Sequence, residues 1–258
     1  MSTSTPHDGV LIAPDPAPAA PRRRPGKIFA AALCGLLGLG LTGGAGYTAV
    51  TGYRAAHRPV TADAAYREAG SLWRSTPVDS LFPPVLDGQG AGPGGADRSW
   101  IRIALAPDAD CADALAADWR ALLAETGCTR VLRATYTDAT RSSFVTVGMV
   151  FTPAGGAAMD SLSGRLTAPP GYGFPDDRRA AWTATVLAEA PVVVYTVSAF
   201  ADGRVLGAPS PAEDTMSKDA TGAVAQAGLG HETKAVAGLM EHALRTLATR
   251  PPAGERAR

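Results

Sequence analysis

The histidines of this chain are spaced too widely for shared chemistry. His231 and His242 lie in a segment with helical periodicity and return to nearly the same face of a helix. Their separation along the axis would be about 16 Å, too long for two ligands of one metal ion or for an acid–base pair. His231 is followed by Glu232, but the second histidine of the zinc-protease motif is missing. The spacing therefore predicts no metal site here.

The serine and aspartate residues also complete no known catalytic or calcium-binding motif. No Gly-x-Ser-x-Gly motif occurs, and Ser217-Lys218 lacks the Ser-x-x-Lys spacing. Asp108 and Asp110 resemble the start of a calcium loop, but Asp113 and Trp119 occupy the positions that need Gly and Glu. Helix capping explains these aspartates better. We predict no catalytic, cofactor-binding or metal-binding residue, and the chain leans towards a protein that is not an enzyme.

The cysteines leave two interpretations open. Cys34 lies in an apolar segment and is best read as a small apolar residue. Cys111 and Cys128 would normally suggest a disulfide if their domain lies in an oxidising compartment. If residues 112–126 form one helix, however, the two cysteines are about 22–25 Å apart, whereas a disulfide needs Cα atoms within about 7 Å. The alanines of this segment favour the continuous helix, and only a shortened helix would reconcile the two.

Charge is distributed unevenly along the chain although the formal net charge is zero. Residues 1–58 contain six basic and two acidic residues, a net of +4, and the remainder contains 18 basic and 22 acidic residues, a net of −4. A mildly acidic domain lacks the clustered basic surface that nucleic acid requires. We therefore expect no nucleic-acid partner.

The long apolar segment predicts a transmembrane helix at residues 27–52. Ile28–Val50 contains no charged residue, and as a helix it would be about 34 Å long, enough for a hydrocarbon core of about 30 Å. Basic residues are more numerous before it than after it, which places the N-terminus in the cytoplasm. These topology-determining residues are Arg22, Arg23, Arg24 and Lys27. The alternatives are a cleaved secretory signal and a soluble protein.

This segment also suggests partners. A signal-anchor helix has the lipid bilayer as its surroundings, and the extracytoplasmic part would meet other membrane or envelope proteins. Gly40 and Gly44 are four residues apart, so they form a candidate helix-dimer face through which the chain would homo-dimerise. A chance match in a segment with six glycines is the simpler explanation.

Hydrophobic periodicity then predicts the folded elements. Helices are expected over residues 61–75, 112–126, 157–166 and 233–248, because apolar residues recur at helical spacing. Strands are expected over residues 100–106, 129–137, 143–152, 181–188 and 192–200, and a hairpin joins the second and third. Trp100, Trp119 and Trp182 fall on strands or helical stripes, which favours core packing over a sugar-stacking surface.

The order of these elements indicates an α+β fold: a transmembrane helix plus a ferredoxin-like βαββαββ antiparallel sheet domain with helices on one face. The predicted organisation runs from a disordered cytoplasmic tail (1–26) and the transmembrane helix (27–52) to a juxtamembrane helix and extended segment (59–86). A glycine-rich linker (87–98), an extracytoplasmic α+β domain (99–248) and a disordered tail (249–258) complete it.

Several of these features together resemble uncharacterised single-pass membrane proteins of actinobacteria with an extracytoplasmic domain. The residues that carry the likeness are Trp73, Leu81-Phe82-Pro83-Pro84, Cys111, Gly127-Cys128, Val131–Tyr136 and Thr146-Val147-Gly148. The resemblance supports a disulfide between the two cysteines and the predicted topology. It implies no activity.

Two functions are consistent with these observations. The first is a membrane-anchored extracytoplasmic interaction or assembly module without catalytic activity, in which an exposed sheet face or edge recruits partners. The second is a ligand-sensing or enzymatic domain whose site forms only in three dimensions. A concave pocket lined by convergent titratable groups would favour the second.

Overall fold

The structure is a computed structural model that describes residues 35, 38, 44–50, 61–92 and 95–249. The chain divides into two compact units, Met1–Pro59 and Val60–Arg258. In the first unit, residues 44–50 are helical. The second unit contains the sheet and the candidate site, and it is described on its own below.

The predicted transmembrane helix is corrected by the structure. Among the described residues, no helix is both long and apolar enough to span a membrane. The single-pass and signal-anchor interpretation is therefore not supported. The six glycines of residues 28–50 lower the mean hydropathy and the helix propensity of this stretch of sequence, most of which lies outside the described residues. Gly44 lies in the helical stretch, whereas Gly40 and the topology-determining residues Arg22, Arg23, Arg24 and Lys27 lie outside the described residues.

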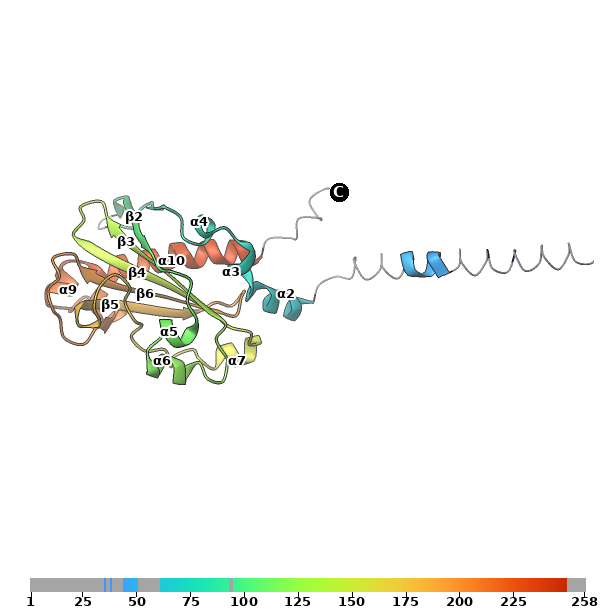
Figure 1. Cartoon of the computed structure of the whole chain (residues 1–258). Coiled ribbons are helices and arrows are strands. Elements are labelled where there is room, and N and C mark those ends of the chain that lie inside the picture. The colour runs from blue at the N-terminus through green and yellow to red at the C-terminus, as the bar shows by residue number, and fades with distance from the viewer. Residues whose placement is uncertain (1–34, 36–37, 39–43, 51–60, 93–94, 250–258) are drawn as a thin grey trace, which may run out of the picture. The chain divides into compact units, whose positions relative to one another are not determined.

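The second unit is built on a seven-stranded sheet in the order β1-β2-β3-β4-β6-β5-β7 (Figure 1). The strands are β1 (Val85–Gly88), β2 (Arg98–Leu105), β3 (Arg130–Asp138), β4 (Ser143–Phe151), β5 (Arg179–Val186), β6 (Val192–Phe200) and β7 (Ser210–Pro211). All neighbouring pairs are antiparallel except β5 and β7, which are parallel. The two longest ladders join β4 to β3 and to β6, so β4 lies at the centre of the sheet.

Short helices and one long helix surround this sheet. They are α2 (Ala62–Ala69), α3 (Leu72–Ser75), α4 (Val78–Leu81), α5 (Cys111–Ala114), α6 (Ala117–Leu122), α7 (Gly156–Asp160), α8 (Ala212–Met216), α9 (Ala223–Gln226) and α10 (Leu229–Ala248), with the 3-10 turn η2 (Asp176–Arg178). Only α10 is longer than two turns and a half, so most of the helical part depends on packing against the sheet.

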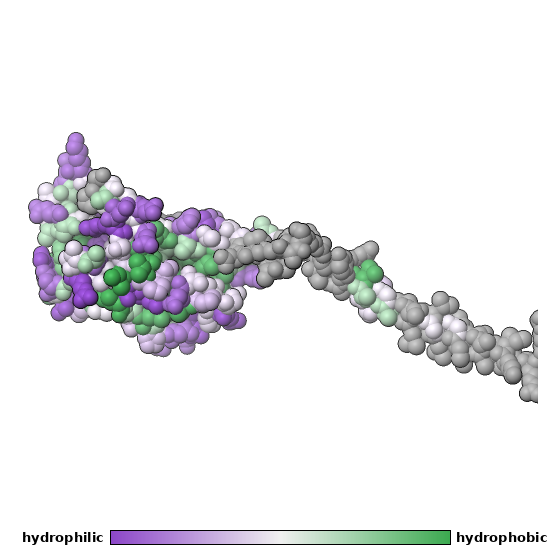
Figure 2. Space-filling view, turned by 90° about the horizontal axis from the view of Figure 1, so that it is seen from above, coloured by the Kyte–Doolittle hydropathy of each residue, from purple (hydrophilic) through white to green (hydrophobic). Residues whose placement is uncertain are grey.

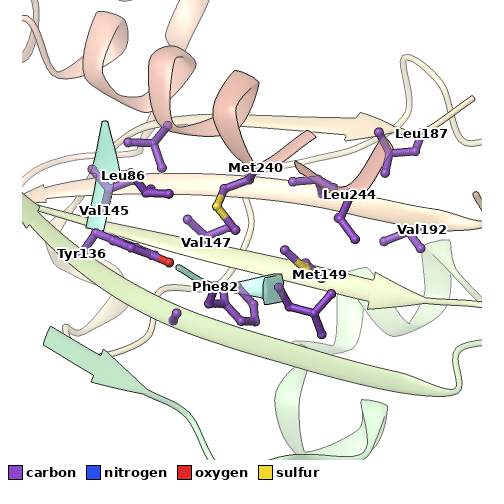
Figure 3. Close-up of a cluster of buried hydrophobic side chains, with 14 of the residues drawn as sticks. Phe82, Leu86, Tyr136, Val145, Val147, Met149, Leu187, Val192, Met240 and Leu244 are labelled. Atoms are coloured by element: carbon purple, nitrogen blue, oxygen red, sulfur yellow. The ribbon is translucent and has the colours of Figure 1, made fainter. Parts of the chain in front are cut away.

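One face of the sheet packs against α10. Alternate residues of β4 point to the same side of a strand, and Val147 and Met149 meet Met240 and Leu244 of the helix there (Figure 3). Each of these four side chains is completely buried. Burial of one such side chain stabilises a fold by roughly 1.5–3 kcal/mol. The stripe on α10 therefore accounts for much of the cohesion of this layer.

The opposite face packs against α5, α6 and α7. Trp119 of α6 is completely buried and meets the ring of Tyr195 on β6 edge-on, with 5.3 Å between the ring centroids. The Tyr195 ring lies over Gly148 of β4, where a Cβ atom would come within 2.0 Å of Tyr195 Cζ. A glycine is thus required at this position because the aromatic ring occupies the space above it.

Coverage of both faces overturns the predicted ferredoxin-like sheet with helices on one face. β4 and β6 carry buried apolar residues on both sides, as in Val192, Val193 and Val194. A strand that alternates between core and solvent would fit one layer of helices, but these strands are buried on both faces. The α+β description holds, and the layering is helices, sheet, helices.

The predicted continuous helix over residues 112–126 is broken into α5 and α6 at Leu115 and Ala116, which adopt extended backbone conformations. The break brings Cys111 and Cys128 together in a disulfide with 6.1 Å between their Cα atoms. The disulfide and the burial of Leu115 and Trp119 outweigh the helical propensity of the alanines.

The segment before the sheet also differs from the prediction. The expected helix over residues 61–75 ends at Gly70, where a Cβ atom would lie 2.7 Å from the carbonyl oxygen of Thr152. The expected extended segment contains α4, and Phe82 is completely buried. β1 and β2 include both ends of the expected linker 87–98, which is therefore a connection within a strand pair.

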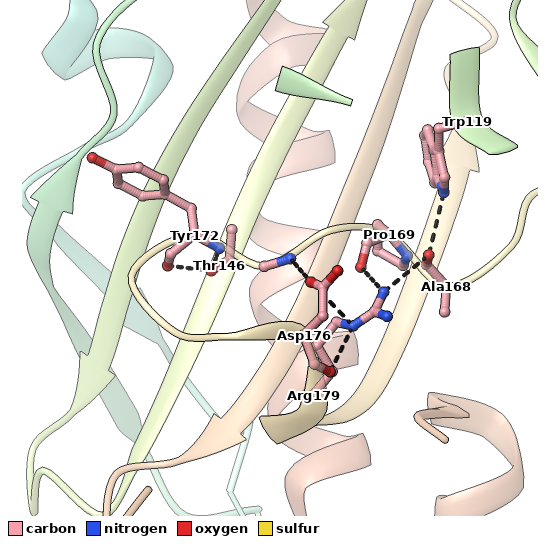
Figure 4. A network of polar contacts seen from close by, with 8 residues as sticks. Trp119, Thr146, Ala168, Pro169, Tyr172, Asp176 and Arg179 are labelled. Carbon is pink, nitrogen blue, oxygen red and sulfur yellow. Dashed lines mark hydrogen bonds and ion pairs between the residues drawn. The ribbon is translucent and has the colours of Figure 1, made fainter. Parts of the chain in front are cut away.

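The loop of residues 166–175 crosses the sheet face that is covered by α5 and α6, and hydrogen bonds hold it in place (Figure 4). The Thr146 hydroxyl donates to the carbonyl oxygen of Tyr172 and accepts from its amide, at 2.9 and 3.0 Å. Arg179 donates to the carbonyl oxygens of Ala168 and Pro169, at 3.3 and 2.7 Å. The loop is thus held by polar contacts to strands β4 and β5.

Candidate functional site

A pocket lies where the amino end of α10 meets the β3–β4 hairpin and the end of β6. Its volume is about 540 Å³. The lining residues are Arg98, Asp138, Arg141, Ser142, Ser143, Phe200, Ala201, Asp202, Arg204, Ala227, Leu229 and Glu232. Half of these residues carry a charge, so titratable groups from four separate chain segments converge here. We call it the Glu232 pocket.

Glu232 forms the buried acidic wall of the pocket. It lies in the first turn of α10, and its exposed fraction is 2%. Its Oε1 atom accepts hydrogen bonds from Trp100 Nε1 at 2.6 Å and from Ser143 Oγ at 2.8 Å. Burial raises the pKa of Glu232, although the bonds from Ser143 and Trp100 and the charge of Arg98 oppose the rise. Both bonds use Oε1, and Oε2 accepts no hydrogen bond from the residues that the structure describes.

Asp138 holds the hairpin that forms one side of the pocket. Its Oδ1 atom accepts from the amides of Ser142 and Ser143, at 2.7 and 3.0 Å, and Oδ2 accepts from Thr140 and from the Ser142 hydroxyl. Burial acts to raise the pKa of Asp138, but these hydrogen bonds outweigh it and lower the pKa to about 2. Asp138 therefore stays ionised at neutral pH and closes the turn, in which Arg141 has a φ of 56°.

The three arginines of the pocket differ in their partners. Arg204 is paired with Asp202, two residues before it, and its guanidinium lies over the ring of Phe200. Arg98 and Arg141 form no ion pair with any residue that the structure describes. Two guanidinium groups therefore line the pocket without a hydrogen-bond acceptor among the residues that the structure describes, and such groups bind carboxylate and phosphate well.

The amino end of α10 adds to this positive character. The helix has 20 residues and begins after Gly228, which has a φ of 70° and provides no side-chain cap. The first amides of a helix lack intrahelical acceptors and carry a partial positive charge. Leu229 and Glu232 of this first turn both line the pocket. A negatively charged group in the pocket would therefore meet the helix dipole favourably.

The lining groups are charged, hydroxyl and apolar side chains. No histidine, cysteine or lysine lines the pocket. The Ser143 hydroxyl is buried and already hydrogen-bonded to Glu232 and Asp138. Over the residues that the structure describes, no group of three or more His, Cys, Asp or Glu side chains could hold a metal ion. Charged and apolar surfaces in one concavity are the usual composition of a ligand pocket.

Of the residues singled out in the sequence, Trp100 supports this site through its hydrogen bond to Glu232, and neither the cysteines nor the histidines line the pocket. Cys111 and Cys128 belong to the α5–α6 face. His231 is exposed on α10. Trp100 and Trp119 are completely buried, and Trp182 is partly buried. Sequence reasoning passed over Glu232 as part of an incomplete metal motif.

One signal in the sequence could have indicated the pocket. The turn Asp138–Ser142 between two predicted strands was expected, and an aspartate at the start of such a turn often caps it. The meeting of this turn with Arg98 and Glu232 had no local signal, because Glu232 is 89 residues from Ser143 and 132 from Trp100 in the chain.

Comparison with known proteins gives no relative to guide the assignment. The chain matches no protein-family model, and no curated protein or solved structure is significantly similar to it. The functional argument therefore rests on the geometry of the pocket.

Proposed function

We propose that the second unit is a ligand-binding domain that takes a small molecule with a carboxylate or phosphate group into the Glu232 pocket. The observation that carries this proposal is the convergence of Arg98, Arg141, Arg204, Asp138, Asp202 and Glu232 around one concavity of about 540 Å³. Pockets for small ligands typically have volumes of about 300–1,000 Å³. A pocket with convergent titratable groups is also the feature that distinguishes a ligand-sensing domain from a simple interaction module.

The acid group of the ligand is inferred from the basic groups that have no partner among the described residues. Asp138 is fully engaged by its own turn and Asp202 is paired with Arg204. Arg98 and Arg141 remain as donors, together with the first turn of α10. A carboxylate or phosphate group would accept hydrogen bonds from these groups and balance their charge.

The disulfide supports an extracytoplasmic place of action. Disulfides persist in oxidising compartments and are rare in the cytoplasm. The Cys111–Cys128 bond joins the two ends of the segment that contains α5 and α6, and neither cysteine lines the pocket. Its role is therefore structural, and we propose that the domain binds its ligand outside the cytoplasm.

The direct test is isothermal titration calorimetry of the full chain with a panel of small carboxylates and phosphates. The variants Arg98→Gln and Arg141→Gln each remove one unpaired guanidinium, and Arg120→Gln on the exposed surface of α6 serves as the matched control. We expect each pocket variant to weaken binding about tenfold, the effect of about 1.4 kcal/mol, and the control to bind like the wild type. Equal binding by all three variants, or no binding by the wild type, would contradict the proposal.

A second candidate is an interaction module that uses an exposed apolar strip on the outer strands. Val85 of β1 and Ile101 of β2 are register partners and share one side, whereas their neighbours Leu86 and Trp100 are buried on the other. Ile103 and Leu105 extend the exposed set along β2. Figure 2 shows that hydrophobic side chains gather in one area of a mostly hydrophilic surface.

The partner that fits this strip is a second copy of the chain, since a strip near a sheet edge can meet itself across a two-fold axis. Replacing Ile101 with Asp should then turn a dimer into a monomer in light scattering. A wild-type chain that is monomeric at all accessible concentrations would rule this candidate out.

A further inference from the structure

Apart from the exposed ion pair of Asp202 and Arg204, the charged groups of the Glu232 pocket differ in depth according to their sign. Glu232 is 2% exposed and therefore lies at the inner wall, while Arg141 on the hairpin tip is exposed at the rim. Arg98 is partly buried, and its positive charge acts to lower the pKa of Glu232. Phe200 and Leu229 add apolar surface to the lining. The pocket thus offers an acidic group inside and basic groups nearer to solvent.

The inner acid has an unused acceptor. Trp100 and Ser143 both donate to Oε1 of Glu232, and no residue that the structure describes donates to Oε2. An acceptor atom on a buried carboxylate that faces a pocket is most stable when a ligand supplies a donor. A ligand with only an anionic group would leave this atom without a partner and would repel it.

We propose that the ligand carries an amine as well as an acid group, as a free amino acid does, and that its ammonium binds Glu232 Oε2 while its acid group binds Arg98 and Arg141. This inference rests on the proposed function and narrows it to zwitterionic ligands. The opposite charges of the ligand would then match the order of charges from the inner wall to the rim. Both ends of the ligand would form charge-assisted hydrogen bonds.

A change in protonation should accompany this binding. The groups that face Glu232 are Arg98 from β2, Asp138 and Ser143 from the hairpin, and Trp100. Burial raises the pKa of Glu232 and so favours its protonated form. An ammonium group favours the ionised carboxylate, and the proton displaced from Glu232 passes to the buffer.

The test is calorimetry of the full chain with free amino acids, each compared with its deamino carboxylic acid and its N-acetyl derivative. Titrations at pH 5 in buffers of different ionisation enthalpy report the number of protons released. We expect amino acids to bind at least about tenfold more tightly than their deamino or acetylated counterparts, with net proton release. The Glu232→Gln variant should lose this preference.

Glu232→Gln is a well-matched variant because its amide oxygen can accept both bonds that Oε1 accepts now. Glu213→Gln, which removes an exposed partner of Lys234, is the control and should retain the preference. Equal binding of amino and deamino acids by the wild type would overturn this inference and leave the binding proposal intact. Binding of phosphates alone would also overturn this inference and leave the binding proposal intact. The absence of all binding would overturn both the inference and the binding proposal.

Discussion

Glu232 in the first turn of α10 accepts a hydrogen bond of 2.6 Å from Nε1 of Trp100 on β2. Both residues are buried, and they are 132 positions apart in the chain. This contact joins the last helix to an early strand of the sheet and places a carboxylate in the wall of the pocket. It satisfies an indole donor that would otherwise be buried without a partner.

The first prediction concerns the pH dependence of Glu232. Burial raises its pKa above the ordinary value of 4.5, so the folded state favours the protonated form. This contribution to stability is full below pH 4.5 and is lost as pH rises through the folded-state pKa. We expect Glu232→Gln to gain stability relative to the wild type as pH rises above this value. Urea unfolding of both proteins from pH 4 to pH 8 measures the difference, and a constant difference would refute the prediction.

The second prediction concerns acid stability and Asp138. Its pKa is about 2 in the folded protein against an ordinary 3.8, so its stabilising effect is present above pH 3.8 and is lost as pH falls towards 2. The shift corresponds to about 2 kcal/mol. Asp138→Asn should therefore be less stable than the wild type by about this amount at neutral pH, and the two should converge near pH 2. Chemical denaturation at several pH values tests this. Asp118→Asn, at an exposed position, is the control, and its difference in stability from the wild type should not change as pH falls.

The third prediction concerns the disulfide. The Cys111–Cys128 bond closes a loop with a sequence separation of 17, and a cross-link of this size stabilises by about 3 kcal/mol through the unfolded state. The double variant Cys111→Ser and Cys128→Ser should lose roughly this stability. Thermal unfolding of the wild type with and without reductant provides the comparison. A reductant that lowers the melting temperature of the double variant as well would show that the effect has another source.

The fourth prediction concerns Gly148 and Tyr195. A methyl group at Gly148 would lie 2.0 Å from Tyr195 Cζ, so Gly148→Ala should destabilise the domain by several kcal/mol, about the upper range for overpacking. Tyr195→Phe should have little effect, because no described residue forms a hydrogen bond with the Tyr195 hydroxyl. It should also fail to rescue Gly148→Ala, since the ring itself is the obstacle.

A smaller residue should behave differently in this pair. Combining Gly148→Ala with Tyr195→Val should cost less than the sum of the two single changes, because the valine leaves room above the alanine. Denaturant unfolding of the four proteins gives the interaction energy. A strictly additive result would show that the ring and the glycine are not coupled.

The sequence by itself determined the strands and their hairpin pairing. The β3–β4 and β5–β6 pairs agree with the prediction within a few residues, because alternation and turn residues are local signals. The stripe of α10 from Val236 to Leu244 was likewise readable from its spacing. Local signals also indicated the Asp138 turn, although not its role beside a pocket.

Only the tertiary structure decided the layering, the disulfide and the site. Leu115 and Ala116 leave the helix because a cross-link and a buried face outweigh their propensities. The segments that build the Glu232 pocket are distant in the chain and share no motif. The burial that raises the pKa of Glu232 depends on contacts between those segments. A local reading of residue types cannot supply such contacts, because each one is a property of the packed chain.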